Sequence, residues 1–514
     1  MLRKLSQIAL TKQNQFRIEP TAEDLAKALQ EQLPALLENR NSLSWQILEN
    51  NYKKTSVIYD LSIRARDCLT EMQLKVVSKM FSNEVTFLWG PPGTGKTTTI
   101  ATAIREMIQQ GKKVLAVSIS NISVDQIALK CIQKDKYPKP LKGEIIRFGY
   151  SKLEDVKNED IFFPSRDIIE KLRKEIEKLD ESLKGSSDPN TIAKLRHQIT
   201  DKATELKKAT EDPIRHAKAT ITTAIQVCLV DVFKEVNFDV VIVDEASMIS
   251  IAIIAILGMI PKEKLIIAGD YKQLAPIALS NTDLSKKWLH RDVFELAGLA
   301  NKVEHSALVM LTQQHRMHED ICDIISNTFY MGKLISNIDE ANRFGSFMLP
   351  TKGKAREFIS ITVQDGSKVE KMENYSRYNL KTSDCIVEIV SKQMRQKEKP
   401  VIGIITPYRV QAQRIQKCLQ TLGEKNSNPH FRKIKVGTVH SFQGDEADVI
   451  IFDMVDNCKE GPGALYKGST GERLMNVAIS RAKGKIIIVG DPDLFKNNSE
   501  FLKLHDLLTK YFLN

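Results

Sequence analysis

Short, continuous runs of valine, isoleucine and leucine alternate with amphipathic segments along most of the chain after about Leu69. Strands that are apolar without alternation are typical of parallel sheets buried on both faces, and helices typically connect them. A helix is predicted from Lys96 to Gln110, closed by Gly111. The pattern therefore predicts an α/β protein with parallel sheets, whose strands lie in the runs 85–89, 113–119, 240–247, 264–270, 401–406, 447–452 and 485–491.

Two segments depart from this alternation. Residues 22–39 read as a helix with Thr21 as its N-cap. Residues 165–210 are charged and carry two apolar stripes at helical spacing, separated by a turn at 185–190. They predict an antiparallel helical hairpin inserted in the first α/β domain, and a solvated surface excursion is the alternative. The stripes are Ile169, Leu172, Ile176, Leu179 and Leu183 on one arm, and Ile192, Leu195, Ile199 and Leu206 on the other.

The composition indicates a globular chain with room for two or three domains, because 42% of its 514 residues are hydrophobic and 27% are charged. The net charge of +11 favours an anionic partner, of which nucleic acid is the commonest, although a lysine-rich source is an alternative explanation. Seven cysteines without a CxxC pair or zinc spacing indicate reduced thiols inside a cell.

The sequence does not specify a single cellular compartment. The longest apolar run, Ile249 to Ile260, is too short to span a bilayer, so no membrane association is expected. The first acidic residue is Glu19, and four basic residues precede it: Arg3, Lys4, Lys12 and Arg17. A basic arm or first helix is expected there, with a mitochondrial transit peptide as the alternative. We therefore expect a cytoplasmic or nuclear protein, or else a mitochondrial one.

A phosphate-binding loop stands between the strand at 85–89 and the helix that follows. Its sequence fits G-x4-G-K-[ST], and the strand and helix on either side are the context that this loop requires. Lys96 is expected to reach the β and γ phosphates of ATP, and the Thr97 hydroxyl to ligate Mg²⁺. The predicted nucleotide-binding residues here are Gly90, Pro91, Pro92, Gly93, Thr94, Gly95, Lys96, Thr97 and Thr98.

An acidic pair follows the strand that begins at Val240. Asp244 is placed to hold Mg²⁺, and Glu245 to accept a proton from the attacking water. An Asp-Glu pair alone is usually a solvated loop, and its position after a buried strand of the same domain favours the catalytic interpretation.

Further motifs occur in a fixed order along the chain. They are Leu69–Gln73, the phosphate loop, Val117–Asp125, Ala219–Thr223, Gly269–Pro276, Gln314–Met317, Thr406–Arg409, Val436–Glu446 and Asn476–Lys483. Together they resemble the superfamily 1B helicases of the up-frameshift, senataxin and immunoglobulin-mu-binding type, from about Leu69 to Asp491. Three positions depart from that pattern: Met248 (where the sequence is also similar to RecD-type helicases), His315 and His440.

The resemblance implies roles for individual residues. Gln73 would read adenine, His315 would stack on it, and Gly444 and Glu446 would complete the nucleotide site. Gln273 would sense the γ-phosphate, and Arg316 and Arg481 would act as arginine fingers, together with Lys96 and Glu245 as catalytic residues. Nucleic-acid contacts would come from Ser120, Asn121, Thr222, Thr406, Pro407, Tyr408, Thr438 and His440.

The resemblance also implies an organisation and an activity. We expect an N-terminal helical or stalk region (1–68), with the β-barrel of larger relatives absent or reduced, and two RecA-like domains at 69–308 and 309–514. The expected function is an ATP- and Mg²⁺-dependent helicase or translocase that moves 5′→3′, hydrolysing ATP at the cleft between the two domains. It would act as a monomer on single-stranded RNA or DNA and duplex junctions. An ATP-switched clamp or ribonucleoprotein remodeller that does not unwind processively is the alternative.

Overall fold

The computed structural model describes residues 8–9, 17–18, 22–52, 61–133, 137–276, 282–283, 288–338, 355–372, 376–394, 400–425, 429–496 and 498–513. Two compact units divide the chain. One unit comprises Met1–Trp89, Lys96–Gly269 and Pro276–Val309, and the other comprises Gly90–Gly95, Asp270–Ala275 and Met310–Asn514. The division near Val309 lies one residue from the expected boundary at 308/309. Two short loops, however, group with the second unit rather than the first.

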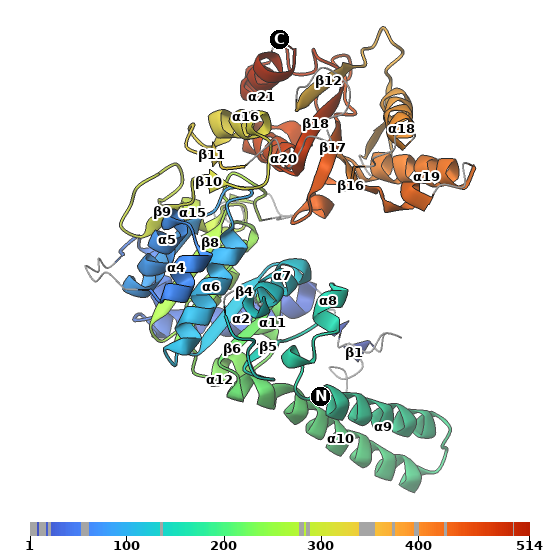
Figure 1. Ribbon diagram of the computed structural model, residues 1–514. Helices are drawn as coiled ribbons and strands as arrows, with labels where there is room; N and C mark the ends of the chain where they lie inside the picture. The colour runs from blue at the N-terminus through green and yellow to red at the C-terminus, as the bar shows by residue number, and fades with distance from the viewer. Residues whose placement is uncertain are drawn as a thin grey trace. The chain divides into compact units, whose positions relative to one another are not determined.

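The first unit is built on a sheet of seven described strands in the order β5-β6-β4-β7-β8-β3-β9 (Figure 1). The pairs β5/β6, β6/β4, β4/β7, β7/β8 and β8/β3 are all parallel. Every residue of β3, β4, β6 and β7 is buried, which confirms the interpretation of the continuous apolar runs. The strands are β3 (Val85–Trp89), β4 (Val114–Ser118), β5 (Ile145–Arg147), β6 (Ala219–Thr223), β7 (Val240–Val243), β8 (Lys264–Gly269) and β9 (Leu308–Met310).

The helices of the first unit pack in two groups, as expected for a sheet covered on both faces. In one group, α6 contacts both α5 and α7, and in the other, α2, α11 and α13 contact one another. The helix predicted from Lys96 to Gln110 is α6, which ends one residue earlier. The bounds are α5 (Glu71–Ser82), α6 (Lys96–Gln109), α7 (Asn121–Ile132), α11 (Ala224–Leu229), α12 (Val232–Glu235), α13 (Ile251–Leu257) and α15 (Val293–Leu296).

The described part of the expected stalk region belongs to the first unit. The helix predicted over 22–39 is α2 (Ala22–Glu38), and its expected N-cap, Thr21, lies outside the described residues. The Gln32 side chain donates to the Cys228 carbonyl oxygen at 2.6 Å, which ties α2 to α11. Among the described residues before Leu69, the strands are the two-residue pair β1 (Ile8–Ala9) and β2 (Arg17–Ile18), and the remaining helices are α3 (Leu43–Leu48) and α4 (Ile63–Cys68).

The predicted helical hairpin is present as α9 (Arg166–Lys184) and α10 (Pro189–His216), which pack along each other (Figure 1). Leu172, Ile199 and Leu206 are buried between the arms or at their base. Two details of the prediction are wrong. The turn is shorter than 185–190, because Asp188 caps α10 and Pro189 is its first residue, and α10 continues six residues beyond 210.

The second unit contains a five-stranded parallel sheet among its described residues, in the order β12-β18-β17-β15-β16. Its core packs α18 and α19 against the sheet through Ile386, Ile415 and Ile451. The strands are β12 (Arg356–Ser360), β15 (Ile402–Thr406), β16 (Lys435–Thr438), β17 (Ala447–Asp453) and β18 (Ala482–Gly490), and the main helices are α16 (Glu319–Phe329), α18 (Leu380–Met394), α19 (Arg409–Lys425), α20 (Gly468–Ser480) and α21 (Leu502–Leu508).

Two smaller sheets accompany it. Strand β10 (Gln313–Gln314) pairs with β11 (Ile335–Ser336), and β13 (Val369–Lys371) forms an antiparallel pair with β14 (Arg377–Asn379). The predicted class, α/β with two parallel-sheet domains and a helical hairpin in the first, is therefore confirmed. Within the part of the chain that the structure describes, no helix is long and apolar enough to cross a membrane.

Gly471 makes the tightest glycine contact of the second unit among the described residues, and its replacement is a test of the α20 packing. An added Cβ would lie 2.0 Å from the Tyr466 carbonyl oxygen, and its three nearest atoms all belong to the Tyr466 main chain. We expect Gly471→Ala to lower the free energy of unfolding by about 1–3 kcal/mol, measured by urea denaturation. Alanine otherwise stabilises a helix interior relative to glycine. Gly185→Ala is the control, because its Cβ would have no neighbour closer than 3.7 Å. An unchanged midpoint for Gly471→Ala would contradict the contact.

Candidate functional site

The loop Gly90–Gly95 joins the end of β3 to the start of α6. Gly93 and Gly95 both have φ of +76°, a left-handed conformation that favours glycine. The Thr94 hydroxyl donates to the Pro91 carbonyl oxygen at 2.8 Å, which closes the turn. Thr97 and Thr98 follow in the first turn of α6, where both are half-buried. Since an α-helix N-terminus carries unsatisfied N–H groups, this geometry suits a phosphate group.

The lysine at the start of α6 meets the predicted acidic pair. The Lys96 ammonium lies 2.7 Å from Glu245 Oε1 and 3.1 Å from Asp244 Oδ1. Burial alone lowers the pKa of Lys96, but the carboxylates of Asp244 and Glu245 outweigh it, so the net pKa is raised and the ammonium stays charged. Burial raises the pKa of Asp244, and the Lys96 charge opposes that shift. The structure therefore brings Lys96 to the predicted acidic pair, which lies almost 150 residues further along the chain.

The backbone at Glu245 is left-handed, with φ of +52°, which is uncommon for a residue with a side chain. The turn that follows, Ala246–Met248, approaches the end of β8 closely. An added Cβ on Gly269 would lie 3.0 Å from the Ser247 nitrogen, so the glycine leaves room for this turn. Such local strain is commonly retained at functional sites, where it fixes the direction of a side chain.

The donor groups near the loop fit Mg²⁺. Thr97 offers a hydroxyl and Asp244 a carboxylate, and Mg²⁺ prefers oxygen ligands and often takes only one or two carboxylates beside phosphate oxygens. The described residues contain no group of three or more His, Cys, Asp or Glu side chains arranged to hold a metal ion.

The second unit brings together Gln273 and Arg481, whose roles at the γ-phosphate stay predictions. Arg481 Nη2 donates to Gln273 Oε1 at 2.5 Å, and Gln273 Nε2 donates to Asp270 Oδ2 at 2.6 Å. The hydroxyl of Tyr330, buried at the end of α16, also donates to Asp270 Oδ2 at 2.6 Å. Asn476 of α20 donates both to Tyr330 Oη and to the Lys272 carbonyl oxygen at 2.8 Å. Sequence reasoning missed Tyr330, because it lies in none of the motifs.

Arg316 lies against the phosphate loop but is paired with an acid. An added Cβ on Gly93 would lie 2.7 Å from Arg316 Cβ, and the His315 amide donates to the Gly93 carbonyl oxygen at 2.9 Å. Arg316 Nε and Lys483 Nζ each lie 2.7 Å from a carboxylate oxygen of Glu446. Burial raises the pKa of Glu446, but these two cations outweigh it and the net pKa is lowered. Glu446 thus holds the position of Arg316.

The residues predicted to read adenine have structural contacts of their own. Gln73 is buried in the first turn of α5. Its side-chain Oε1 accepts from the Thr70 main-chain amide at 3.0 Å, and its own main-chain amide donates to Thr70 Oγ1 at 3.4 Å. This reciprocal arrangement is a capping box. The His315 ring approaches the Asn337 carbonyl oxygen at 3.2 Å. Gly444 adopts a φ of +84° in the turn before Glu446. Their adenine-binding and nucleotide-binding roles stay predictions.

The expected nucleic-acid contacts of the first unit fall into two kinds. Ser120 caps α7 by accepting from the Ser123 amide at 3.1 Å, and Asn121 begins that helix, with both half-buried. Thr222, by contrast, is fully buried in β6 and its hydroxyl donates to the Phe148 carbonyl oxygen at 3.1 Å. The expectation that the Thr222 hydroxyl holds a phosphate does not agree with this burial.

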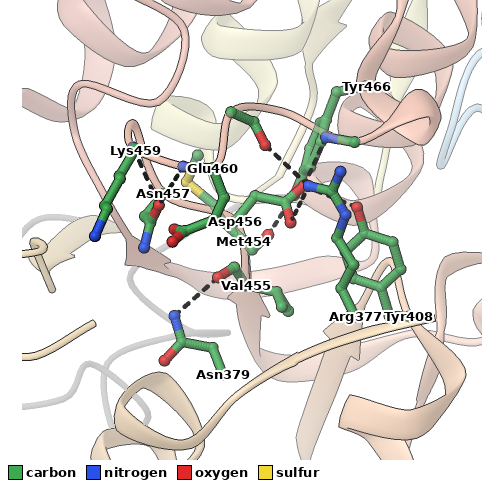
Figure 2. Close-up of polar contacts among 12 residues, drawn as sticks. Arg377, Asn379, Tyr408, Met454, Val455, Asp456, Asn457, Lys459, Glu460 and Tyr466 are labelled. Atoms are coloured by element: carbon green, nitrogen blue, oxygen red, sulfur yellow. Dashed lines mark hydrogen bonds and ion pairs between the residues drawn. The ribbon is translucent and has the colours of Figure 1, made fainter. Parts of the chain in front are cut away.

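A similar correction applies in the second unit. Thr406, Pro407 and Tyr408 are all buried, whereas Thr438 is half-buried and His440 is exposed. The Tyr408 hydroxyl donates to Asp456 Oδ2 at 2.8 Å (Figure 2). Its side chain therefore supports the end of the sheet rather than presenting a ring to a nucleic acid.

Figure 2 shows the polar cluster to which Tyr408 belongs. Arg377 Nη1 donates to Asp456 Oδ1 and to the Gly461 carbonyl oxygen, both at 2.9 Å. Val455, just before Asp456, has a φ of +65°, and Asn379 Nδ2 donates to its carbonyl oxygen at 2.9 Å. Sequence reasoning missed this cluster, because Arg377 and Asp456 are distant in the chain and belong to no motif quoted above.

Both halves of the chain match known protein families. Two family profiles, each described as an AAA domain, match residues 68–281 and 289–493. The chain is 26% identical to an uncharacterised ATP-dependent helicase of Methanocaldococcus jannaschii, over 92% of this chain and 76% of that protein. It is 29% identical to the regulator of nonsense transcripts 1 of Dictyostelium discoideum, over 82% of this chain but only 31% of that protein. An arterivirus nonstructural protein 10 (helicase) in complex with DNA aligns over 84% of this chain and 65% of that one, at 14% identity and a TM-score of 0.40.

A phosphate loop on the first parallel sheet, the acidic pair opposite it and a second parallel-sheet unit define a P-loop nucleoside triphosphatase with two RecA-like units. Within that class, the chain belongs to the superfamily 1B helicases of the up-frameshift type.

Two substitutions at the same ion pair test the site. Lys96→Ala removes the cation expected on the β and γ phosphates, and we expect ATP turnover to fall by about 10²–10³ or more. Glu245→Gln keeps the shape of the side chain but removes the proton acceptor, so it should bind ATP while losing turnover by a similar factor. Phosphate release measures turnover, and a fluorescent ATP analogue measures binding. Lys112→Ala is the control, because Lys112 is a half-buried lysine beyond the far end of α6 that pairs with Glu263 and not with the predicted site residues. Normal turnover by Lys96→Ala would rule out this loop as the site.

Proposed function

We propose that this protein is an ATP-dependent helicase that translocates 5′→3′ on single-stranded nucleic acid and separates duplexes. The observation that carries the proposal is the contact of Lys96 with Asp244 and Glu245 beside the loop Gly90–Gly95. The family membership supports the helicase activity. The chain spans 76% of one curated relative and about a third of another, so the activities of those whole proteins serve here only as support.

The hydrolysis step follows from the ion pair. Incoming phosphates compete with Glu245 for Lys96, which leaves the Glu245 carboxylate able to accept a proton from the attacking water. Mg²⁺, held by Thr97 and Asp244, would neutralise charge on the phosphate oxygens. Arg481 and Arg316 supply further positive charge to the γ-phosphate, and Gln273, bonded to Arg481, links that arginine to the segment that follows β8.

The nucleic acid is proposed to bind at the carboxyl ends of the parallel strands, where Ser120 and Asn121 follow β4 and Thr438 and His440 follow β16. Contacts of this type bind phosphates and fix position without reading sequence. Thr222, Thr406 and Tyr408 are buried, and the hydroxyls of Thr222 and Tyr408 are already bonded to Phe148 and Asp456, so the proposal rests on the more exposed residues of these loops. The net charge of +11 favours such a partner.

Tailed duplexes test both the activity and its direction. We expect ATPase stimulation by single strands, and displacement of the strand from duplexes with a 5′ tail but not from those with a 3′ tail. RNA and DNA versions are compared side by side, with Lys96→Ala as the inactive control. Stimulated hydrolysis with no displacement on any substrate would favour an ATP-switched clamp or remodeller. Displacement only from 3′-tailed duplexes would overturn the proposed polarity.

The α9–α10 hairpin is proposed to act as a wedge or grip for nucleic acid rather than as part of the ATPase site. It carries exposed basic residues on both arms, among them Lys171, Lys178, Lys194 and Lys207. Two other basic residues of the hairpin are less available to a ligand. Arg173 is half-buried, and Lys202 is paired with Glu175 at 3.2 Å and Glu205 at 2.9 Å.

Shortening the hairpin tests this role. Glu175 and Lys202 are opposite each other, so replacing 177–200 by a Gly/Ser turn removes the outer part and leaves the buried Leu172 and Leu206 at the base. We expect fewer base pairs separated per ATP hydrolysed, measured by parallel displacement and phosphate-release assays. Replacing only Gly185–Asp188 by a Gly/Ser turn is the matched control. Equal unwinding by the shortened and control proteins would rule out the wedge.

A further inference from the structure

A fully buried ion pair lies beneath the loop that follows β5. Arg147 is the last residue of β5, Asp125 lies in α7, and Arg147 Nε donates to Asp125 Oδ1 at 2.7 Å. Neither side chain is exposed at all. Burying two charges is costly unless their remaining hydrogen-bonding atoms are also satisfied. The pair is therefore expected to hold something in place, and its other contacts identify what it holds.

Those contacts fix the main chain from Phe148 to Leu153. Asp125 Oδ2 accepts from the Lys152 and Leu153 amides at 2.6 and 2.9 Å. The Arg147 guanidinium donates to the Phe148 carbonyl oxygen through Nη1 and to the Tyr150 carbonyl oxygen through Nη2, the latter at 2.6 Å. Between them, Gly149 takes a φ of +93°, which lets the chain fold around the guanidinium. The loop is thus held at four backbone positions by two side chains.

The same arginine orients Asn121. Arg147 Nη2 lies 2.9 Å from Asn121 Oδ1, in addition to its bond with the Tyr150 carbonyl oxygen. A guanidinium can only donate, so the amide oxygen of Asn121 must face it and the Nδ2 donor lies on the other side of the amide. Asn121 opens α7 after its N-cap Ser120, and a helix N-terminus favours phosphate. One nitrogen atom therefore joins the start of α7 to the Tyr150 loop.

An aromatic ring and two lysines complete this part of the surface. Tyr150 is half-buried, and the ammonium groups of Lys152 and Lys157 lie 5.6 and 6.0 Å from its ring centroid. Lys152 is exposed, whereas Lys157 is half-buried and pairs with Glu154 at 2.5 Å. Aromatic rings that pack on bases, beside cations that attract phosphates, are the combination that single-strand-binding proteins use.

We propose that Tyr150, Lys152 and Asn121 form a strand-binding subsite of the first unit, fixed by the Arg147–Asp125 pair. In this subsite Tyr150 packs on a base or sugar, Lys152 binds a phosphate, and the Asn121 amide donates to the same backbone. Arg147 and Asp125 are positioning residues that touch no nucleic acid themselves. The inference rests on the proposed function and extends it to a loop that no sequence motif indicated.

Single-strand affinity of the full-length protein tests the subsite, with fluorescent oligothymidylate and oligouridylate as probes over a salt series. Stacking on one aromatic residue is worth about 1–3 kcal/mol, so Tyr150→Ala should bind about 5- to 100-fold more weakly while Tyr150→Phe stays near the parent. Lys152→Ala should lower the magnitude of the log–log salt slope by about 0.7, the value for one phosphate of a single strand. Lys262→Ala, an exposed lysine just before β8 at the amino edge of the same sheet, should change neither quantity.

The substitution Asn121→Asp tests the orientation of the amide. An aspartate keeps an oxygen on Arg147 but replaces the outward donor by a second acceptor, so we expect a loss of at least ten-fold in affinity with an unchanged melting temperature. If Tyr150→Ala also lowers the melting temperature, its weaker binding no longer tests the subsite. The affinity and salt slope of Lys152→Ala, a change at an exposed residue, then decide the outcome. Parent-like affinity and salt slope for Tyr150→Ala and Lys152→Ala would overturn the subsite and leave the proposed function standing. Failure of the parent protein to bind single strands would overturn both.

Discussion

Parallel strands all end at the same edge of their sheet, and the functional geometry of this protein depends on that constraint. The order β4-β7-β8-β3 brings the loop after β3, the acidic pair after β7 and the glycine that ends β8 to one edge. Lys96 and Glu245 are 149 residues apart, yet their side chains lie 2.7 Å from each other. The ion pair is a consequence of strand order more than of local sequence. Gly93 and Gly269 leave the space that Arg316 and the Ser247 main chain, respectively, occupy.

In each unit, the backbone groups of a loop that follows a strand are satisfied by an arginine–aspartate pair. Loops that leave buried strands carry backbone groups that need hydrogen-bond partners. In the first unit Arg147 and Asp125 provide them, and in the second unit Arg377 and Asp456 do so, with the Asp456 side chain fully buried and that of Arg377 15% exposed. Asp456 Oδ2 accepts from both the Gly463 amide and the Tyr408 hydroxyl, at 2.7 and 2.8 Å. In both units a buried arginine–aspartate pair therefore defines the shape of a loop at the carboxyl edge.

The sequence predicted what periodicity and local motifs encode. The unbroken apolar runs predicted two parallel sheets, and the spacing of the apolar residues predicted α6 and the hairpin. The meeting of Lys96 with Asp244 and Glu245 agrees with the sequence prediction, because the phosphate loop and the acidic pair each follow the end of a strand. The burial of Thr222 and Tyr408 was not predicted, because their hydroxyl partners, Phe148 and Asp456, are 74 and 48 residues away. The roles of Arg147 and Arg377 could not be predicted for the same reason: their partners come from separate elements, and no local pattern marks them.

The hairpin also bears on how the first sheet assembles. Strands β5 and β6 are neighbours in the sheet, although the whole stretch from Phe148 to Lys218 separates them. Within that stretch α9 and α10 contact each other over short sequence separations, such as Glu175 with Lys202. Local contacts of this kind form early and shorten the connection that must still close, and the entropy of closure grows with the length of the flexible part. A long insertion that folds on itself therefore slows the pairing of its flanking strands far less than an unstructured loop of equal length would.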